Sequence, residues 1–290
     1  MSAAGGTRPE PTTFLSGESG EVSGVRRTVT RTVGDLWLDA GARLRRTSHK
    51  LDRLAAAEPP RQVLVLSAYR PESQLPGALA ELRSERHDVR LALGATGELE
   101  PALADSTVAQ GLGGGKFENL NQVLETAAPM YEYDWLLVVD DDVRLPERFL
   151  DRFMGVVGRF GLDLAQPAQS LRSHAAWRVT RRHARSLARE TRFVEIGPVT
   201  AFSAPVAAEL LPFPELRFGW GLDLHWAAVA AERGWRCGVV DALPVHHTSA
   251  PVAAAYGHEE AIEEAQRFLA GRPYLQSERA QETLAVHRRP

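Results

Sequence analysis

Three consecutive carboxylates, Asp140, Asp141 and Asp142, directly follow the five apolar residues 135–139. An apolar run of this length is typical of a strand buried on both faces, as in a parallel sheet. Adjacent carboxylates repel one another unless a cation lies among them, and Mg²⁺ or Mn²⁺ prefers oxygen ligands and often carries substrate phosphates. In an extended backbone Asp140 and Asp142 point to one side and Asp141 to the other. The pattern predicts an Asp-x-Asp pair for a metal and a bound nucleotide; the alternative is a solvated acidic loop that caps the next helix.

A glycine-rich stretch, residues 111–115, precedes this strand and leads through Lys116 into a helix that we expect to reach about residue 128. Glycines permit a closely packed loop before a helix N-terminus, where anions are favoured. The stretch is not a P-loop, because no Ser or Thr follows the lysine as that motif requires. Lys116, Asn119 and Asn121 are therefore candidates to contact a nucleotide or diphosphate. The alternative is a surface helix capped by asparagine.

A second candidate region is the segment 218–226, in which Gly219 and Gly221 flank Trp220. This composition favours a tightly folded loop against a substrate. Asp223 follows, at the start of an amphipathic helix that extends to about residue 233. Its carboxylate is either the N-cap of that helix or a general base that accepts a proton from an attacking hydroxyl.

Two histidines, His246 and His247, follow a predicted strand over residues 235–240. An imidazole that arrives from a late strand can complete a ligand set begun by Asp142. Adjacent side chains in an extended segment point apart, so we expect only one of the two to bind.

The elements that must position these residues begin with a β-α-β unit: a strand over 62–68, a helix over 74–87 and a strand over 89–93. Such a unit implies a parallel crossover, and ligands of open α/β sheets bind beyond the carboxyl ends of the strands. Tyr69, just past the first strand, either stacks on a base or covers the sheet edge. Arginines between 178 and 189 have the spacing of a solvated helix face, or of a phosphate contact.

Composition and length fit one sizeable α/β domain with appendages: 290 residues, 44% of them apolar. We expect a disordered tail over 1–24, a basic helical arm over 25–60, the catalytic domain over 61–275 and a C-terminal tail over 276–290. The single cysteine excludes an internal disulfide and suits a reducing cytoplasm.

Charge and hydropathy restrict the classes of binding partner that fit this chain. The net charge of −3 argues against a nucleic-acid partner, and no apolar run approaches the roughly 20 residues that span a bilayer. The basic arm is expected to pack on the domain or on a second subunit, or else to lie on an anionic membrane surface. We therefore expect a cytoplasmic protein, with peripheral contact at the inner face of the membrane as the alternative.

Taken in order over residues 62–250, these motifs resemble the GT-A-type glycosyltransferases, and in particular the large inverting family 2 group. The loop 219–223 also resembles the acceptor-side loop of the β-1,4-galactosyltransferases. Family members often carry Glu-Asp where this chain has Leu222 and Asp223; the aspartate is retained.

The resemblance implies a GT-A, Rossmann-like fold: an α/β, mostly parallel sheet flanked by helices in a single catalytic domain. It also implies a metal-dependent, inverting glycosyltransferase of the hexosyltransferase type. Such an enzyme moves a sugar from a nucleoside-diphosphate sugar, here expected to be UDP-linked, to the hydroxyl of an acceptor. Mn²⁺ or Mg²⁺ would be bound through the diphosphate.

Motifs and resemblance together assign roles to individual residues. We expect the donor nucleotide to contact Tyr69, Lys116, Asn119, Asn121, Asp140 and Asp141. The expected metal ligands are Asp140, Asp142 and His246, with His247 as the replacement for His246. Asp223 would be the catalytic base, with Trp220, Gly221 and Glu195 on the acceptor side.

Two alternatives belong to other classes. A sugar-1-phosphate nucleotidyltransferase would need a basic pyrophosphate loop directly after the first strand, where this chain offers only Arg70. A non-catalytic scaffold that binds sugar nucleotides would show no turnover with any donor and acceptor.

Overall fold

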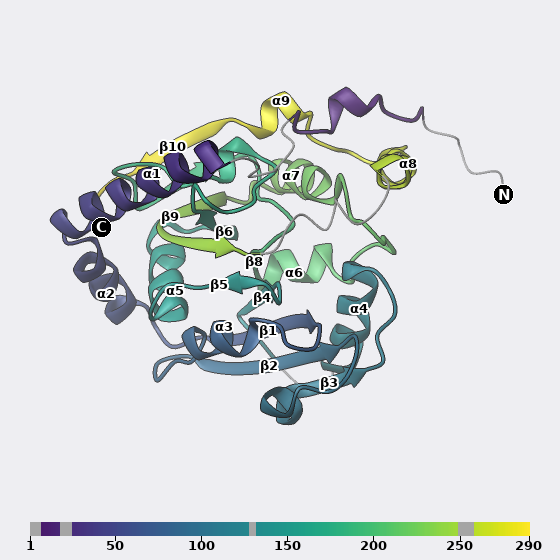
Figure 1. Cartoon of the computed structure of the whole chain (residues 1–290). Helices are drawn as coiled ribbons and strands as arrows, with labels where there is room; N and C mark the ends of the chain where they lie inside the picture. The colour runs from purple at the N-terminus through teal and green to yellow at the C-terminus, as the bar shows by residue number, and fades with distance from the viewer. Residues whose placement is uncertain (1–6, 18–24, 128–131, 249–257) are drawn as a thin grey trace.

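The computed structural model describes residues 7–17, 25–127, 132–248 and 258–290 (Figure 1). Its strands form one large sheet with a short addition, and their bounds are β1 Gln62–Tyr69, β2 Asp88–Ala95, β3 Thr107–Gln110, β4 Trp135–Val139, β5 Val143–Arg144, β6 Leu164–Gln169, β7 Ala188–Thr191, β8 Val199–Ser203, β9 Cys237–His247 and β10 Thr283–His287.

The strand order is β10-β7-β9-β6-β8-β4-β1-β2-β3, and β5 pairs with β9 off this path. β4, β1, β2 and β3 are parallel neighbours, as are β6 and β9. Among the described strands of the main path, only β7 and β8 run against the others, since each is antiparallel to both of its neighbours. This confirms the expected α/β architecture, a mostly parallel Rossmann-like sheet flanked by helices.

Helices cover both faces of the sheet (Figure 1). Their bounds are α1 Val25–Leu44, α2 Thr47–Ala57, α3 Leu75–Glu81, α4 Lys116–Ala127, α5 Phe149–Phe160, α6 Ala204–Leu210, α7 Leu222–Arg233, α8 His258–Leu269 and α9 Ser277–Ala280. One core cluster joins the sheet to α4, α6, α7 and α8, and a second joins it to α2, α3 and α5. Alternate residues of β4 enter alternate clusters, as expected for a strand covered on both sides.

The helix expected over 74–87 is shorter than predicted, since α3 ends at Glu81. The arginine series also differs from the prediction, because residues 178–189 form a 3-10 turn, a loop and the start of β7 instead of a helix. Arg189 is buried and pairs with the buried Asp241 (Nε–Oδ2 2.9 Å). The guanidinium groups of Arg182 and Arg189 therefore serve internal ion pairs, which helical spacing does not reveal.

The basic arm packs on the domain through α2. Leu51 and Leu54 are buried in the same cluster as Phe153 of α5. Gly155 makes this approach possible, since a Cβ there would lie 2.5 Å from the backbone nitrogen of Ala55. The two helix backbones are thus in direct contact, which only a glycine permits.

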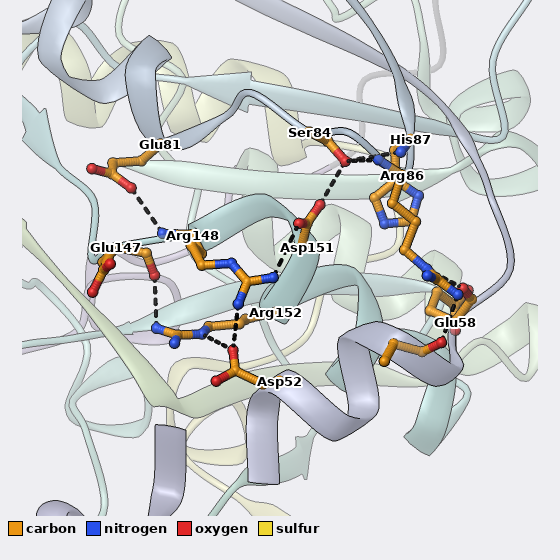
Figure 2. Close-up of polar contacts among 11 residues, drawn as sticks. Asp52, Glu58, Glu81, Ser84, Arg86, His87, Glu147, Arg148, Asp151 and Arg152 are labelled. Atoms are coloured by element: carbon orange, nitrogen blue, oxygen red, sulfur yellow. Dashed lines mark hydrogen bonds and ion pairs between the residues drawn. The ribbon is translucent and has the colours of Figure 1, made fainter. Parts of the chain in front are cut away.

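A polar network surrounds this junction (Figure 2). Arg152 donates from Nε to Asp52 of α2 (2.9 Å), and Arg148 donates to the same oxygen from Nη1 (3.1 Å). The backbone N–H of Arg148 donates to Glu81 of α3 (2.8 Å), and Ser84 donates to Asp151 of α5 (2.6 Å). The contacts tie α2, α3 and α5 to one another.

Both chain ends contain more structure than predicted. Of the expected N-terminal tail, residues 1–6 and 18–24 lie outside the described residues, but residues 11–13 form a 3-10 turn and Phe14 is 2% exposed. At the other end, the expected loose tail contains α9 and β10, which pairs with β7. His287 explains why a polar segment can join the sheet, because its ring stacks on Phe160 (4.2 Å) and its Nε2 lies 2.9 Å from Glu190.

Candidate active site

The candidate site lies at the edge of the sheet where the parallel strands end. β4 and β9 deliver Asp140, Asp142 and His247 to this edge, because both strands run in the same direction. β8 runs the opposite way, so the segment before it, residues 194–198, reaches the same edge. α4 follows β3, and α7 precedes β9, so both begin there as well. This topology gathers five distant parts of the chain.

A candidate metal-ligating group at this edge consists of Asp140, Asp142 and His247. Each can offer one ligand atom, and these atoms all lie within 4.8 Å of one another. His247 Nε2 lies 2.9 Å from Asp142 Oδ1. The structure therefore brings together the two outer aspartates of the acidic motif and adds one imidazole.

His247, and not the expected His246, belongs to this group. β5 pairs antiparallel with β9, opposing Val143 to His247 and Arg144 to His246. Because side chains alternate along a strand, His247 points toward Asp142 while His246 points away and approaches Ser170 Oγ through Nδ1 (3.3 Å). The assignment of His246 as a metal ligand is thus corrected, for a reason that depends on strand register.

Lys116 holds Asp140 from the other side. Its Nζ lies 2.6 Å from Asp140 Oδ1 and donates to the carbonyl oxygen of Ile196 (2.8 Å). Gly197 packs against this pair, since a Cβ at that position would lie 2.7 Å from Asp140 Oδ2 and 2.9 Å from Lys116 Nζ. The absence of a side chain at residue 197 leaves room for the ion pair.

Asp223 lies across the same segment. Its carboxylate accepts hydrogen bonds from the backbone N–H groups of Leu224 (2.9 Å) and Ile196. The backbone N–H of Ile196 thus binds Asp223, and its carbonyl oxygen binds Lys116, which in turn pairs with Asp140. Ile196 and Lys116 therefore link the two carboxylates. Asp223 is not the helix N-cap, because Gly221 occupies that position with a φ of +83°. The capping alternative is wrong, and the carboxylate is left buried at the site.

Glu195 lies behind Asp223 in a polar network. Its carboxylate accepts from Gln169 Nε2 (2.9 Å), Thr180 Oγ1 (2.9 Å) and the backbone N–H of Ala176 (3.1 Å). Both of its oxygens are thereby engaged. Glu195 can influence Asp223 and His247 through its charge, since it interacts electrostatically with both.

Burial dominates the titration of these carboxylates. Burial, followed by the neighbouring charge of Glu195, raises the pKa of Asp223 to about 8. Burial likewise raises the pKa of Asp140, against the opposing charge of Lys116, and raises the pKa of Glu195. Burial acts the other way on His247, but the hydrogen bond and charge of Asp142 outweigh it, so the net shift raises the pKa of His247. An electronegative field of this kind favours a bound cation.

Four of the residues expected on the donor side have other partners. Tyr69 is fully buried, and its hydroxyl contacts Thr107 Oγ1 (2.9 Å), so its ring is not available for stacking. Asp141 points away from its neighbours and pairs with Arg70 (2.7 Å). The Tyr69 ring supports the sheet, and the Asp141 carboxylate supports the loop after β1. The expected contacts of these two residues with the nucleotide are corrected accordingly.

The two asparagines of α4 are also engaged. Asn119 binds both backbone polar groups of Gly114, at 2.9 and 3.0 Å, and so closes the glycine loop at the helix start. Asn121 binds both backbone polar groups of Phe213, at 2.8 and 2.9 Å. Each amide uses one donor and one acceptor for the fold, and the expected contacts of both residues with a nucleotide stay a prediction.

Trp220 and Gly221 lie at the contact between α7 and α8. The ring of Trp220 is 5.6 Å from that of His258, and a Cβ on Gly221 would lie 2.9 Å from Leu269. Gly221 begins the helix that carries Asp223. These two residues therefore position the helix start, and their expected role toward an acceptor stays a prediction.

The sequence reasoning missed Gln166, Gln169 and Thr180. Both glutamines lie on β6, whose six residues are all buried, and Gln166 Oε1 accepts from the backbone N–H of Glu195. Amides in a fully buried strand must find partners inside the protein. That composition is the signal that could have pointed to the network.

The donor set fits a divalent metal. Two carboxylates and one imidazole match Mn²⁺ or a related ion that accepts both oxygen and nitrogen ligands. The cationic Nζ of Lys116 lies 2.6 Å from Asp140, so a positive charge already lies against one of these carboxylates.

Comparison with known proteins supports the fold. No protein-family model and no curated protein matches the sequence. The crystal structure of a mycobacterial protein is similar with a TM-score of 0.50 at 17% sequence identity, over 77% of this chain and 79% of that one. The mannosyltransferase PcManGT from Pyrobaculum calidifontis, in complex with GDP-Man and Mn²⁺, gives a TM-score of 0.44 at 16% identity, over 73% of this chain and 65% of that one.

Proposed function

We propose that this chain is a metal-dependent inverting glycosyltransferase that moves a sugar from a nucleoside-diphosphate sugar, UDP-linked in the first instance, to an acceptor hydroxyl. The observation that carries the proposal is the grouping of Asp140, Asp142 and His247 within 4.8 Å, together with the buried Asp223 across one peptide segment. The motif order that resembles GT-A-type glycosyltransferases supports it from the sequence side.

Asp142 and His247 would hold the metal, with Asp140 as a further ligand or as a contact to the nucleotide. When bound, the ion neutralises charge that develops on the leaving diphosphate. Lys116 supplies a second positive charge beside Asp140. Because its Nζ also binds the carbonyl of Ile196, the lysine keeps that segment in place as the donor enters.

Asp223 would accept the proton of the acceptor hydroxyl. Its burial, at 5% exposed, excludes water from around the carboxylate, and its pKa of about 8 makes it a stronger base than an exposed aspartate. Backbone donors from Leu224 and Ile196 fix its orientation. A single displacement at the anomeric carbon, with one base on the acceptor side, inverts that centre.

The nucleotidyltransferase alternative is less well supported. It would need free basic side chains directly after β1, but the Arg70 guanidinium is committed to Asp141 from both Nε (3.0 Å) and Nη2 (2.7 Å).

The proposal can be tested by thermal shift with UDP- and GDP-sugars, in Mn²⁺ and in EDTA. A donor at 100 times its Kd stabilises the native state by about 2.7 kcal/mol, which for a chain of this size raises Tm by roughly 5–10 °C. We expect the sugar nucleotide to raise Tm in the presence of Mn²⁺ and not in EDTA. We then expect sugar transfer to an acceptor, which mass spectrometry detects. Stabilisation without any turnover, over a wide range of acceptors, would favour the scaffold.

The neighbouring histidines give a matched pair of variants. His247→Ala should weaken Mn²⁺ binding by at least about tenfold, because it removes one of three ligands, whereas His246→Ala should leave it unchanged. Isothermal titration with Mn²⁺ measures both. Equal affinities in the two variants would remove His247 from the metal site and with it the basis of the proposal.

A further inference from the structure

The helix α1 carries a row of exposed apolar side chains. Five of the seven large hydrophobic side chains that are exposed among the described residues lie on it: Val29 at 56%, Val33 at 59%, Leu36 at 64%, Trp37 at 68% and Leu44 at 87%. Their spacing places them on one face of the helix, along about 22 Å at 1.5 Å per residue. We call these five residues the apolar stripe.

The opposite face of α1 is fixed to the domain. Asp35 is 2% exposed and accepts from the backbone N–H groups of Leu171 (3.0 Å) and Arg172 (3.1 Å). Gly34 lies against the Leu171 side chain, where a Cβ would be 2.8 Å from Cδ1. This docking determines the rotation of the helix, so the apolar stripe points away from the protein.

Docking also changes the charge that the arm presents. Its three aspartates pair with arginines of the domain: Asp35 and Asp39 with Arg182, at 3.1 and 2.8 Å, and Asp52 with Arg148 and Arg152. Among the arm residues whose burial the structure describes, the arginines that remain exposed are Arg43, Arg45, Arg46 and Arg53. The outer surface of the arm is therefore apolar and cationic.

A basic pocket lies at the junction of α1 and α2. Arg45 and Lys50 line it from the arm, and Arg185 and Arg288 line it from the domain. Arg45, Arg185 and Arg288 are exposed, and none of the three forms an ion pair with a described residue. The one carboxylate in the lining, Asp241, is buried and neutralised by Arg189 at 2.9 Å.

We propose that α1 docks on a bilayer containing anionic phospholipid, with the apolar stripe in the headgroup region and the basic pocket on a lipid phosphate. An amphipathic helix with exposed apolar residues and flanking arginines binds such a surface through both terms at once. A second copy of the chain is a poorer occupant, because two such faces would bring arginine against arginine. The inference concerns a surface distinct from the candidate active site and does not depend on the proposed function.

The test is co-sedimentation of the full chain with vesicles of phosphatidylcholine alone, or with one third phosphatidylglycerol. We expect binding to the anionic vesicles only. Leu36→Ser with Trp37→Ser should lower the partition coefficient at least about tenfold, because both side chains are more than half exposed and lose their burial in the interface. Arg185→Glu with Arg288→Glu should lower it about 25-fold or more, at roughly fivefold for each cation.

A matched control pair is Leu99→Ser with Arg83→Glu, which changes the same types of exposed side chain in the segments after and before β2, outside both the apolar stripe and the basic pocket. This pair should bind anionic vesicles like the parent, and all variants should keep the parent Tm. Absence of binding to anionic vesicles, or equal loss in the control pair, overturns the proposal. So does a dimer in light scattering that dissociates in the Leu36→Ser, Trp37→Ser variant without any vesicle binding, which would assign the stripe to a second copy.

Discussion

Replacement of Asp223 by asparagine should stabilise the protein while it abolishes transfer. The buried carboxyl has a pKa of about 8, against 3.8 in its ordinary state. At pH 7 the unfolded chain releases this proton and the folded chain retains it. Folding therefore opposes ionisation by about 1.36 kcal/mol for each pH unit above 3.8, or about 4 kcal/mol at pH 7.

Asparagine has nearly the same shape and cannot ionise, so this cost disappears. Its amide nitrogen cannot accept a hydrogen bond, which offsets about 1 kcal/mol of the gain. The net increase in the free energy of unfolding is then about 3 kcal/mol at pH 7. Near pH 4 the carboxyl is protonated in the folded chain and only about half ionised in the unfolded chain, so the cost falls to about 0.6 kcal/mol, the lost hydrogen bond offsets it and the increase vanishes. Well above pH 8 the increase stays constant, because both states are then ionised.

Urea unfolding in EDTA at pH 4, 7 and 8.5 measures this dependence. Asp105→Asn, a change at an exposed carboxylate, serves as the control and should show no such trend. In Mn²⁺, Asp223→Asn should lower kcat by about 10²–10⁴-fold and leave the Kd of the donor unchanged. A stability difference that is independent of pH would refute the account of the buried acid, and loss of donor binding would reassign Asp223 to structure.

Three further outcomes are expected. Gly197→Ala should weaken Mn²⁺ binding at least about tenfold in calorimetry, because its Cβ would lie 2.7 Å from an oxygen of Asp140; unchanged affinity would contradict the close contact. Glu195→Gln should shift the acid limb of the pH–rate profile to lower pH, on the order of one unit, because the charge that raises the pKa of Asp223 is removed. Asp35→Asn should lower the free energy of unfolding by about 2–3 kcal/mol in urea, since it weakens a buried ion pair of the arm; an unchanged midpoint would mean that this pair contributes nothing.

Much of the frame was predictable because the relevant signals are local. The apolar run before Asp140 identified a strand buried on both faces, and the alternation of side chains placed Asp141 opposite its two neighbours. The β-α-β start identified the parallel half of the sheet. These inferences need only hydrophobic pattern and strand geometry, which a sequence carries directly.

Contacts between distant segments of the chain were not predictable from the sequence. Asn121 binds the backbone of Phe213, more than 90 residues away, and Tyr69 contacts Thr107. The choice between His246 and His247 is set by the register of β5 on β9. No spacing rule states which of two adjacent side chains faces inward until the partner strand is known.

The contact between α2 and α5 has a consequence for where the polypeptide can be cut. A break at Pro59 and Pro60 looks from composition like a natural boundary. Removal of everything before it would strip Leu51 and Leu54 from the cluster that contains Phe153, and would open the groove beside Gly155 to water. A protein truncated at this point would thus expose a hydrophobic surface to solvent. Its solubility therefore depends on residues that precede the sheet, in addition to any contact of those residues with a membrane.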